Sequence, residues 1–154
     1  MEVFFTLLEE KDIIELVDPM TKAFDDDAKR FNGKEKDGPP GYDDGSFLYK
    51  WGLDNNGSIS YKIIVDSKSV GAFIIWWNED GESTLGTIFV DPELQNKGVG
   101  RKAWCFIEDK FLTKSWILDT PTWAVRNHHF YEKVCGFIKI GTKDDQVIYK
   151  KFYK

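Results

Sequence analysis

The stretch from Gln95 to Gly100, which reads QNKGVG, constrains the fold of this chain more than any other feature. It follows an apolar run at 87–90 that is typical of a strand, and it leads into a segment with apolar residues at helical spacing. Two glycines let the backbone approach an anion closely, and the first amides of the following helix are unpaired at the positive end of its dipole. Lys97 and Arg101 add positive charge. The stretch therefore predicts a phosphate-binding turn between a strand and a helix.

The length and composition predict one domain, spanning residues 1–154. A chain of 154 residues that is 42% hydrophobic and 16% aromatic is large enough for a packed core or an aromatic-lined cleft. The net charge of −5 argues against binding to nucleic acid or to an anionic membrane, because both require a basic surface. A cationic partner fits this charge better.

The cysteines, the histidines and the first residues bear on the compartment and on metal binding. Cys105 and Cys135 have no metal-ligand spacing, and we interpret both as reduced core thiols. His128 and His129 are adjacent on a predicted helix and point in different directions, so no metal site is expected. The N-terminus has acidic residues where a secretory signal needs positive ones, which favours a cytoplasmic protein.

The hydrophobic periodicity predicts an α/β fold with a central, mostly antiparallel mixed sheet flanked by helices. A polar insert at 25–56, rich in Gly, Pro and Asp, interrupts the pattern and carries a short helix or lid near Trp51. Thr122 is the expected cap of the last helix, and Gly136 its stop. The expected strands are 3–8, 59–65, 70–77, 82–90, 115–119, 137–140 and 146–153, and the main helices are 9–24, 99–111 and 122–134.

The glycine stretch does not fit the two commonest nucleotide-binding loops. A nucleotide P-loop requires a Lys-Ser/Thr pair after its glycines, and here Arg101-Lys102-Ala103 follows. A dinucleotide-binding loop requires three spaced glycines after the first strand of a βαβ unit, whereas this one follows an antiparallel meander. On these grounds alone, an ordinary strand-to-helix turn also remains open.

Two segments resemble the GNAT family of N-acetyltransferases. The first runs from Val90 to Arg101 and is similar to the family's acetyl-CoA signature, Gln/Arg-x-x-Gly-x-Gly/Ala, matched by Gln95, Gly98 and Gly100. The second, from Phe130 to Phe137, is similar to an aromatic-Tyr-Glu-Lys-x-x-Gly-Phe segment of the family. The two occur in the family's order, and the expected elements agree with its fold over nearly the whole chain, least over the insert at 25–56.

The resemblance implies acetyl-CoA as cosubstrate and a set of residues that bind it. The pyrophosphate would lie on the amides from Gln95 to Arg101, and the pantetheine would pair with the backbone of Phe89 and Val90. The family often has an Asn at the place of Ala124, and here Asn127 is the nearest substitute, with a solvated helical Asn as the alternative. The full expected set is Phe89, Val90, Gln95, Asn96, Lys97, Gly98, Val99, Gly100, Arg101, Asn127, Phe130 and Lys133.

The resemblance also suggests the catalytic groups. Tyr131 matches the family's Tyr that protonates the departing CoA thiolate, and a core Tyr without a catalytic role is the alternative. An attacking amine must first lose a proton, and Glu82 is the candidate base. The family's Glu would fall nearer Thr84, so a turn carboxylate without a role is equally open for Glu82.

These features predict an N-acetyltransferase that moves an acetyl group from acetyl-CoA to a primary amine by direct attack in a ternary complex. A CoA- or acyl-CoA-binding or sensing module without catalysis is the alternative, and an interaction protein with an empty site is a third class. The partner would be a small-molecule or peptide amine, and a homodimer stays open. A cationic amine suits the acidic and aromatic residues of the insert, although a solvated acidic loop explains them as well: Asp25, Asp26, Asp27, Asp43, Asp44, Tyr42, Phe47, Tyr49 and Trp51.

Overall fold

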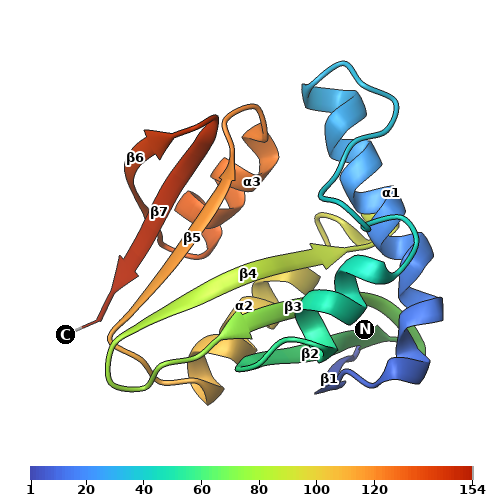
Figure 1. The fold of residues 1–154 in the computed structure, drawn as a ribbon, viewed down its shortest axis with the longest axis horizontal. Helices are drawn as coiled ribbons and strands as arrows, with labels where there is room; N and C mark the ends of the chain where they lie inside the picture. The colour runs from blue at the N-terminus through green and yellow to red at the C-terminus, as the bar shows by residue number, and fades with distance from the viewer. Residues whose placement is uncertain (154) are drawn as a thin grey trace.

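The computed structural model describes residues 1–153, and its centre is a seven-stranded sheet in the order β1-β2-β3-β4-β5-β7-β6 (Figure 1). All neighbouring strands are antiparallel except β4 and β5, which are parallel. This confirms the predicted mixed sheet. The strands are β1 (Val3–Leu7), β2 (Ser58–Val65), β3 (Lys68–Trp76), β4 (Glu82–Val90), β5 (Ser115–Pro121), β6 (Ile138–Lys143) and β7 (Gln146–Phe152).

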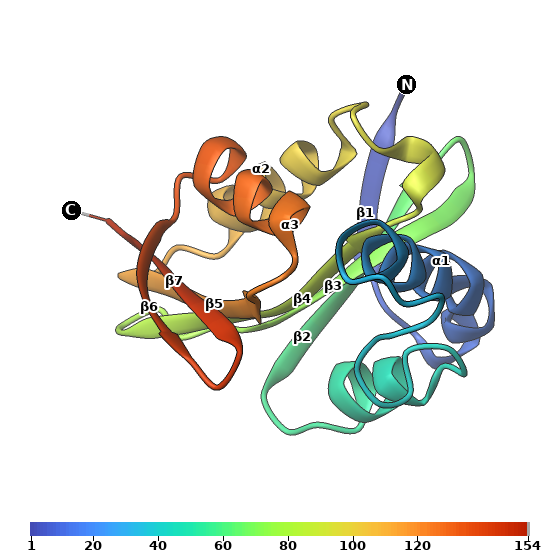
Figure 2. The same cartoon turned by 90° about the horizontal axis from the view of Figure 1, so that it is seen from above.

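The helices form one layer on each face of the sheet, as Figure 2 shows from above. α1 (Ile13–Phe31), preceded by the 3₁₀ turn η1 (Glu10–Asp12), lies on one face together with the π-helical segment η2 (Leu48–Leu53). α2 (Val99–Lys110) and α3 (Val125–His129) lie on the other. The 3₁₀ turn η3 (Pro92–Leu94) precedes α2, and α3 continues directly as the π-helical turn η4 (Phe130–Val134).

The alternation of side chains along β3 explains why there is a core on each side of the sheet. Ala72 and Ile74 are buried in the cluster formed with α1, whereas Phe73 and Ile75 are buried in the cluster that contains Trp104 of α2. Successive residues of a strand point to opposite faces, so a strand covered on both faces is apolar throughout. β3 is therefore the central strand on which both helical layers pack.

The sheet divides between β4 and β5. The two strands pair only where Glu82–Thr84 of β4 meets Ser115–Ile117 of β5, and β5 then pairs with β7. The register of β3 against β4 shifts at Gly86, where an added Cβ would lie 2.4 Å from the Trp76 ring. Beyond this bulge β4 and β5 diverge, as Figure 1 shows. Residues 87–90 consequently have no ladder partner on the β5 side among the described residues.

α1 is longer than the sequence predicts, since it continues past residue 24 to Phe31. Ala28 is fully buried on this added length, and Arg30 forms an ion pair with Asp26 one turn earlier at 2.9 Å. Such packing and an i,i+4 pair support helix where polarity alone suggests a loop. The acidic residues at 25–27 therefore lie on a helix and not in a loop.

The predicted cap of the last helix is wrong. α3 begins at Val125, and the amide of Thr122 donates instead to the Asp145 carbonyl oxygen at 2.9 Å, in the turn between β6 and β7. Gly136 does end the helical segment, with a φ of +81°. Cys105 also differs from expectation because it is exposed, whereas Cys135 is buried. Among residues 1–153, no helix is both long enough and apolar enough to cross a membrane.

Candidate active site

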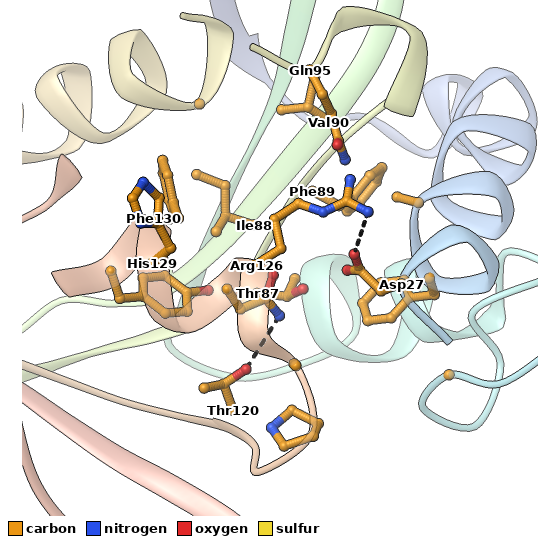
Figure 3. A pocket seen from close by; sticks show the side chains of 18 of the residues that line it. Asp27, Thr87, Ile88, Phe89, Val90, Gln95, Thr120, Arg126, His129 and Phe130 are labelled. Atoms are coloured by element: carbon orange, nitrogen blue, oxygen red, sulfur yellow. Dashed lines mark hydrogen bonds and ion pairs between the residues drawn. The ribbon is translucent and has the colours of Figure 1, made fainter. Parts of the chain in front are cut away.

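A cavity of about 800 Å³ opens where β4 and β5 separate (Figure 3). Its walls come from both helical layers: α1 and the segment after it on one side, and the turn before α2, the end of β5 and α3 with η4 on the other. Thr87–Val90 of β4 lie between them. The cavity thus extends from the start of α2 to the face of α1 that carries Ala23, Phe24 and Asp27.

The turn before α2 has the conformation of an anion cradle. Gly98 adopts a φ of +81°, and its carbonyl oxygen accepts the first hydrogen bond of α2, from the amide of Lys102 at 3.0 Å. The amides that open the helix have no partners within it. Gly100 packs on the Phe130 ring, where an added Cβ would lie 3.1 Å from the nearest ring atom. Gln95 and Arg101 line the cavity beside these amides, so the donor set fits a phosphate group.

The neighbouring edge of β4 offers backbone groups to the same cavity. Phe89 and Val90 both line it, as do Thr87 and Ile88. The Phe89 side chain is buried in the core beneath α1, so the residue serves the cavity through its main chain. Unpaired strand amides and carbonyls next to a phosphate cradle fit an extended ligand that carries amide groups.

Tyr131 lies on η4 and lines the cavity. In this turn the amide of Cys135 donates to the Phe130 carbonyl oxygen at 3.0 Å, the wider spacing of a π turn. Burial raises the pKa of the Tyr131 hydroxyl above its ordinary value, and the negative charges of Asp27 and Asp119 raise it further. The hydroxyl therefore keeps its proton at neutral pH.

The two histidines and Asn127 occupy different places at the same helix. Asn127 lines the cavity and donates from Nδ2 to the hydroxyl oxygen of Thr120 at 3.2 Å. His128 lies with Nε2 2.9 Å from the Pro121 carbonyl oxygen, whereas His129 is exposed and lines the cavity. The side chains of His128 and His129 thus diverge.

The structure brings every predicted site residue to the cavity wall except three. Lys97 and Lys133 are exposed and lie outside the lining. Glu82 lies at the other end of β4, where the strand is still paired with β5, and forms an ion pair with Lys150 at 2.9 Å. The pairing of β4 with β5 at this end therefore places Glu82, the predicted base, outside the cavity lining.

An arginine spans the cavity between the two helical layers. Arg126 of α3 reaches α1, where Nη2 lies 2.9 Å from Oδ2 of Asp26. The same atom lies 3.3 Å from Oδ1 of Asp27, and Figure 3 shows this second contact. Its guanidinium also lies 5.4 Å from the centre of the Phe31 ring. Asp26 accepts a further hydrogen bond from Arg30 at 2.9 Å. The two neighbouring carboxylates therefore share one cation.

The pKa values of the two carboxylates are shifted in opposite directions. Burial raises the pKa of Asp27 to about 6, and the attraction of Arg126 does not offset this. For Asp26, burial also acts upward, but hydrogen bonds from Arg30 and Arg126 bring the pKa below its ordinary value. Asp27 lines the cavity and Asp26 does not.

Most of the acidic and aromatic residues expected around the acceptor have structural partners. Asp25 accepts a hydrogen bond from the buried Tyr42 hydroxyl at 2.6 Å and pairs with Lys36 at 2.8 Å. Asp44 accepts from the hydroxyl and the amide of Ser46. The acidic and aromatic side chains that do line the α1 side of the cavity are Phe24, Asp27, Asp37 and Phe47.

Sequence reasoning missed Arg126 and Asp119, both of which line the cavity. One signal for Arg126 was available, because a cation in the first turn of a helix opposes the helix dipole and needs a nearby anion. Asp119 comes at the end of an apolar strand, a place that by itself indicates only a turn.

The sequence matches the model of the acetyltransferase (GNAT) family over residues 20–137, and the chain therefore belongs to this family. Enzymes of this family use acetyl-CoA as cosubstrate, which the phosphate cradle and the open β4 edge fit. The family thus identifies the chain as an acetyl-CoA-dependent acyltransferase at the level of its class. The sequence matches no curated protein.

Solved structures share the whole fold at low sequence identity. The PaiA N-acetyltransferase of Thermoplasma acidophilum, in complex with coenzyme A, is 16% identical with a TM-score of 0.74, covering 99% of this chain and 100% of that one. An acetyltransferase of Thermus thermophilus is 14% identical, with a TM-score of 0.79 and coverage of 99% and 98%. The spermidine N-acetyltransferase of Vibrio cholerae, in complex with CoA and spermine, is 18% identical, with a TM-score of 0.61 and coverage of 96% and 92%.

Proposed function

We propose that this protein transfers an acetyl group from acetyl-CoA to a primary amine by direct attack of the amine in a ternary complex. The observation that carries the proposal is the continuity of the cavity from the phosphate cradle of α2, past Tyr131, to the acidic side beneath α1. One cavity of about 800 Å³ with an anion-binding end and an acidic end favours two ligands of opposite charge.

The chain holds the acetyl donor through main-chain groups. The amides from Gly98 to Arg101 bind its pyrophosphate, and the open edge of β4 at Phe89 and Val90 pairs with its pantetheine. Asn127 and Phe130 line the same side from α3 and η4. Lys97 and Lys133 are exposed outside this lining, and their proposed role is to contact the phosphates from solvent. The donor then presents its thioester between β4 and Tyr131.

Tyr131 acts as the general acid. As the amine nitrogen forms its bond to the acetyl carbon, the carbon–sulfur bond breaks and the Tyr131 hydroxyl gives its proton to the thiolate. The raised pKa of this hydroxyl keeps the acid in its protonated form across the neutral range.

A cationic acceptor is the substrate class that the cavity favours. Asp27 and Asp37 put negative charge on the α1 side, and the rings of Phe24 and Phe47 lie beside them. Carboxylates and aromatic faces attract an ammonium group. Spermine in the Vibrio cholerae structure is an amine of this kind, and polyamines head the panel to be tested.

Two measurements on the purified protein test the proposal. Isothermal titration with acetyl-CoA measures donor binding, and thiol release from acetyl-CoA measures transfer with a panel of a polyamine, a lysine peptide, an aminoglycoside and an arylamine. We expect saturable binding, and thiol release that depends on at least one amine. Mass spectrometry should find the product amine heavier by one acetyl group.

Each failure has a separate meaning. Binding of acetyl-CoA without amine-dependent thiol release across the panel would contradict the transferase and favour a CoA-binding or sensing module. A folded sample with no heat of binding at high micromolar acetyl-CoA would contradict both.

A further inference from the structure

We infer that Asp27 is the catalytic base for the acceptor amine: it receives the substrate ammonium in the cavity and takes its proton, while Asp26 and Arg126 hold it in place. This inference rests on the proposed transferase function. It replaces Glu82, which lies outside the cavity, with a carboxylate from the other helical layer.

The division of hydrogen bonds between the two carboxylates is the first argument. Arg126 donates its hydrogen bond to Asp26, which is also bonded by Arg30. Its contact with Asp27, at 3.3 Å, is an ion pair without hydrogen-bond geometry, and Oδ1 of Asp27 is buried with no hydrogen-bond partner among the described residues. A carboxylate oxygen that is buried without a hydrogen-bond donor requires an explanation, and an ammonium ligand at this carboxylate supplies donors.

The position of Asp27 relative to the acid is the second argument. Asp27 lines the same cavity as Tyr131, and its negative charge contributes to the raised pKa of the Tyr131 hydroxyl. The two side chains come from opposite helical layers, with Thr87–Val90 of β4 between them. A base on one side of the reacting carbon and an acid on the other is the arrangement that direct attack requires.

Protonation supports the same role. A base is most effective when its pKa lies near the working pH, and burial brings the pKa of Asp27 to about 6. The fixed charge of Arg126 limits this rise, so the carboxylate is ionised at neutral pH and ready to accept a proton. Asp26, with its lowered pKa and two arginine partners, is a weaker base and a better anchor for Arg126.

The protons balance over the reaction. An ammonium nitrogen loses two protons in becoming an amide. Asp27 takes the first proton and releases it to solvent. Tyr131 gives its own proton to the thiolate and is reprotonated by the second proton from the nitrogen. One proton therefore leaves in all. The new bond is nitrogen to acetyl carbon, and the bond broken is carbon to sulfur.

Other titratable groups face this region and define the controls. Arg126 of α3 and Asp26 and Arg30 of α1 act directly on Asp27. A histidine can produce a pH dependence in the same range, so His129 requires its own variant. The remaining titratable side chains of the cavity are Asp37, Arg101, Asp119, Tyr131 and Asp145.

The test compares Asp27→Asn with Asp26→Asn and His129→Gln, using the amine that the wild-type protein accepts. We expect Asp27→Asn to lower kcat about a hundredfold or more, the usual contribution of a general base, and to leave the dissociation constant of acetyl-CoA unchanged. Asp26→Asn should cost far less, because Asp27 itself is unchanged and still pairs with Arg126. The wild-type rate should rise with pH through about 6, and this limb should disappear only in Asp27→Asn.

A weakly basic acceptor such as hydrazine supplies a readout that a structural role would not move. Hydrazine is largely neutral at pH 8.5 and needs no removal of an ammonium proton before it attacks, so Asp27→Asn should lose much less activity with it than with an alkylamine. Three results would each overturn the assignment. They are equal losses of activity with both acceptors, equal losses in Asp26→Asn and Asp27→Asn, and a pH dependence near 6 that disappears in His129→Gln and persists in Asp27→Asn. Inactivity of the wild-type protein with every amine would instead contradict the proposed function.

Discussion

At the scale of single residues, Tyr131 owes its predicted role to a hydroxyl that burial keeps protonated. Replacing it by Phe removes only that oxygen. We expect Tyr131→Phe to lower kcat about a hundredfold while the dissociation constant of acetyl-CoA stays the same, measured by thiol release and titration calorimetry. Tyr149→Phe is the matched control. The Tyr149 hydroxyl donates to Glu132 at 2.5 Å, and Tyr149 does not line the cavity. Unchanged turnover in Tyr131→Phe would remove this residue from the mechanism.

Asp27 carries a second prediction, on stability. Its pKa in the folded protein, about 6, is higher than its ordinary value of 3.8, so the folded state takes up a proton that the unfolded state lacks between these two pH values. Stability contributed by this group is therefore lost as pH rises through that window. Asp27→Asn should raise the unfolding free energy at pH 7 by on the order of 1–3 kcal/mol, and change it little at pH 4.

Asp26→Asn should behave in the opposite way. The pKa of Asp26 is lowered in the folded state, so its contribution is present above its ordinary value and is lost as pH falls. We expect this variant to be less stable than the wild type at pH 7 and similar to it in acid. Urea unfolding of both variants at the two pH values measures the effect. A destabilised Asp27→Asn at pH 7 would contradict the view that its charge is costly to the fold.

At the scale of elements, the turn before α2 depends on one left-handed residue. Gly98 has a φ of +81° but open space around its Cβ position, so alanine there is strained without clashing. We expect Gly98→Ala to weaken acetyl-CoA binding by about tenfold, because the left-handed conformation costs roughly 1–2 kcal/mol in an L-residue and the amides shift to relieve it. Titration calorimetry measures the change.

Gly141→Ala provides the comparison for this turn. Gly141 also has open space around it, but it lies in β6 and its φ is not positive. Binding by that variant should match the wild type. Equal binding by Gly98→Ala would mean that the amides of this turn do not hold the donor.

The elements also show what the sequence could and could not predict. The strands from Ile59 to Val90 and the helix after Gly98 follow from alternation and helical spacing, because the packing is local to each element. The end of α1 at Phe31 was missed, since the buried face of Ala28 and the contact with Arg126 come from distant parts of the chain. The start of α3 was missed for a similar reason, as Thr122 is bound to the β6–β7 turn.

In the candidate site, too, the sequence predicted the residues that are close together in the chain and missed those that are far apart. Sequence motifs predicted two contiguous segments that the structure places at the cavity wall: the turn around Gly98 and the segment around Tyr131. The acceptor side could not be identified, because Asp27 and Arg126 meet across 99 residues of chain and no spacing connects them. The sequence also could not show that Glu82 lies outside the cavity, because a position on β4 does not say which end of that strand is open.

At the scale of the whole molecule, the proposed donor site spans two parts of the sheet that are joined by a short parallel pairing of β4 with β5. A ligand that contacts β4, α2 and α3 together should stabilise the protein as a unit. At a concentration one hundred times its dissociation constant, acetyl-CoA should add about 2.7 kcal/mol and raise the melting temperature by roughly 5–10 °C. Adenosine, which lacks the pyrophosphate and the pantetheine, should shift it very little. Equal shifts with both compounds would contradict binding along the cradle and the β4 edge.

The division between β4 and β5 has a consequence for how this protein can diverge. The open edge of β4 at 87–90 offers main-chain amides and carbonyls, and every residue except proline supplies both groups. This edge therefore depends on the path of the backbone and not on particular side chains. Substitutions can accumulate along 87–90 while the edge itself survives. Solved structures that share this fold at 14–18% identity show that the chain path itself tolerates extensive substitution.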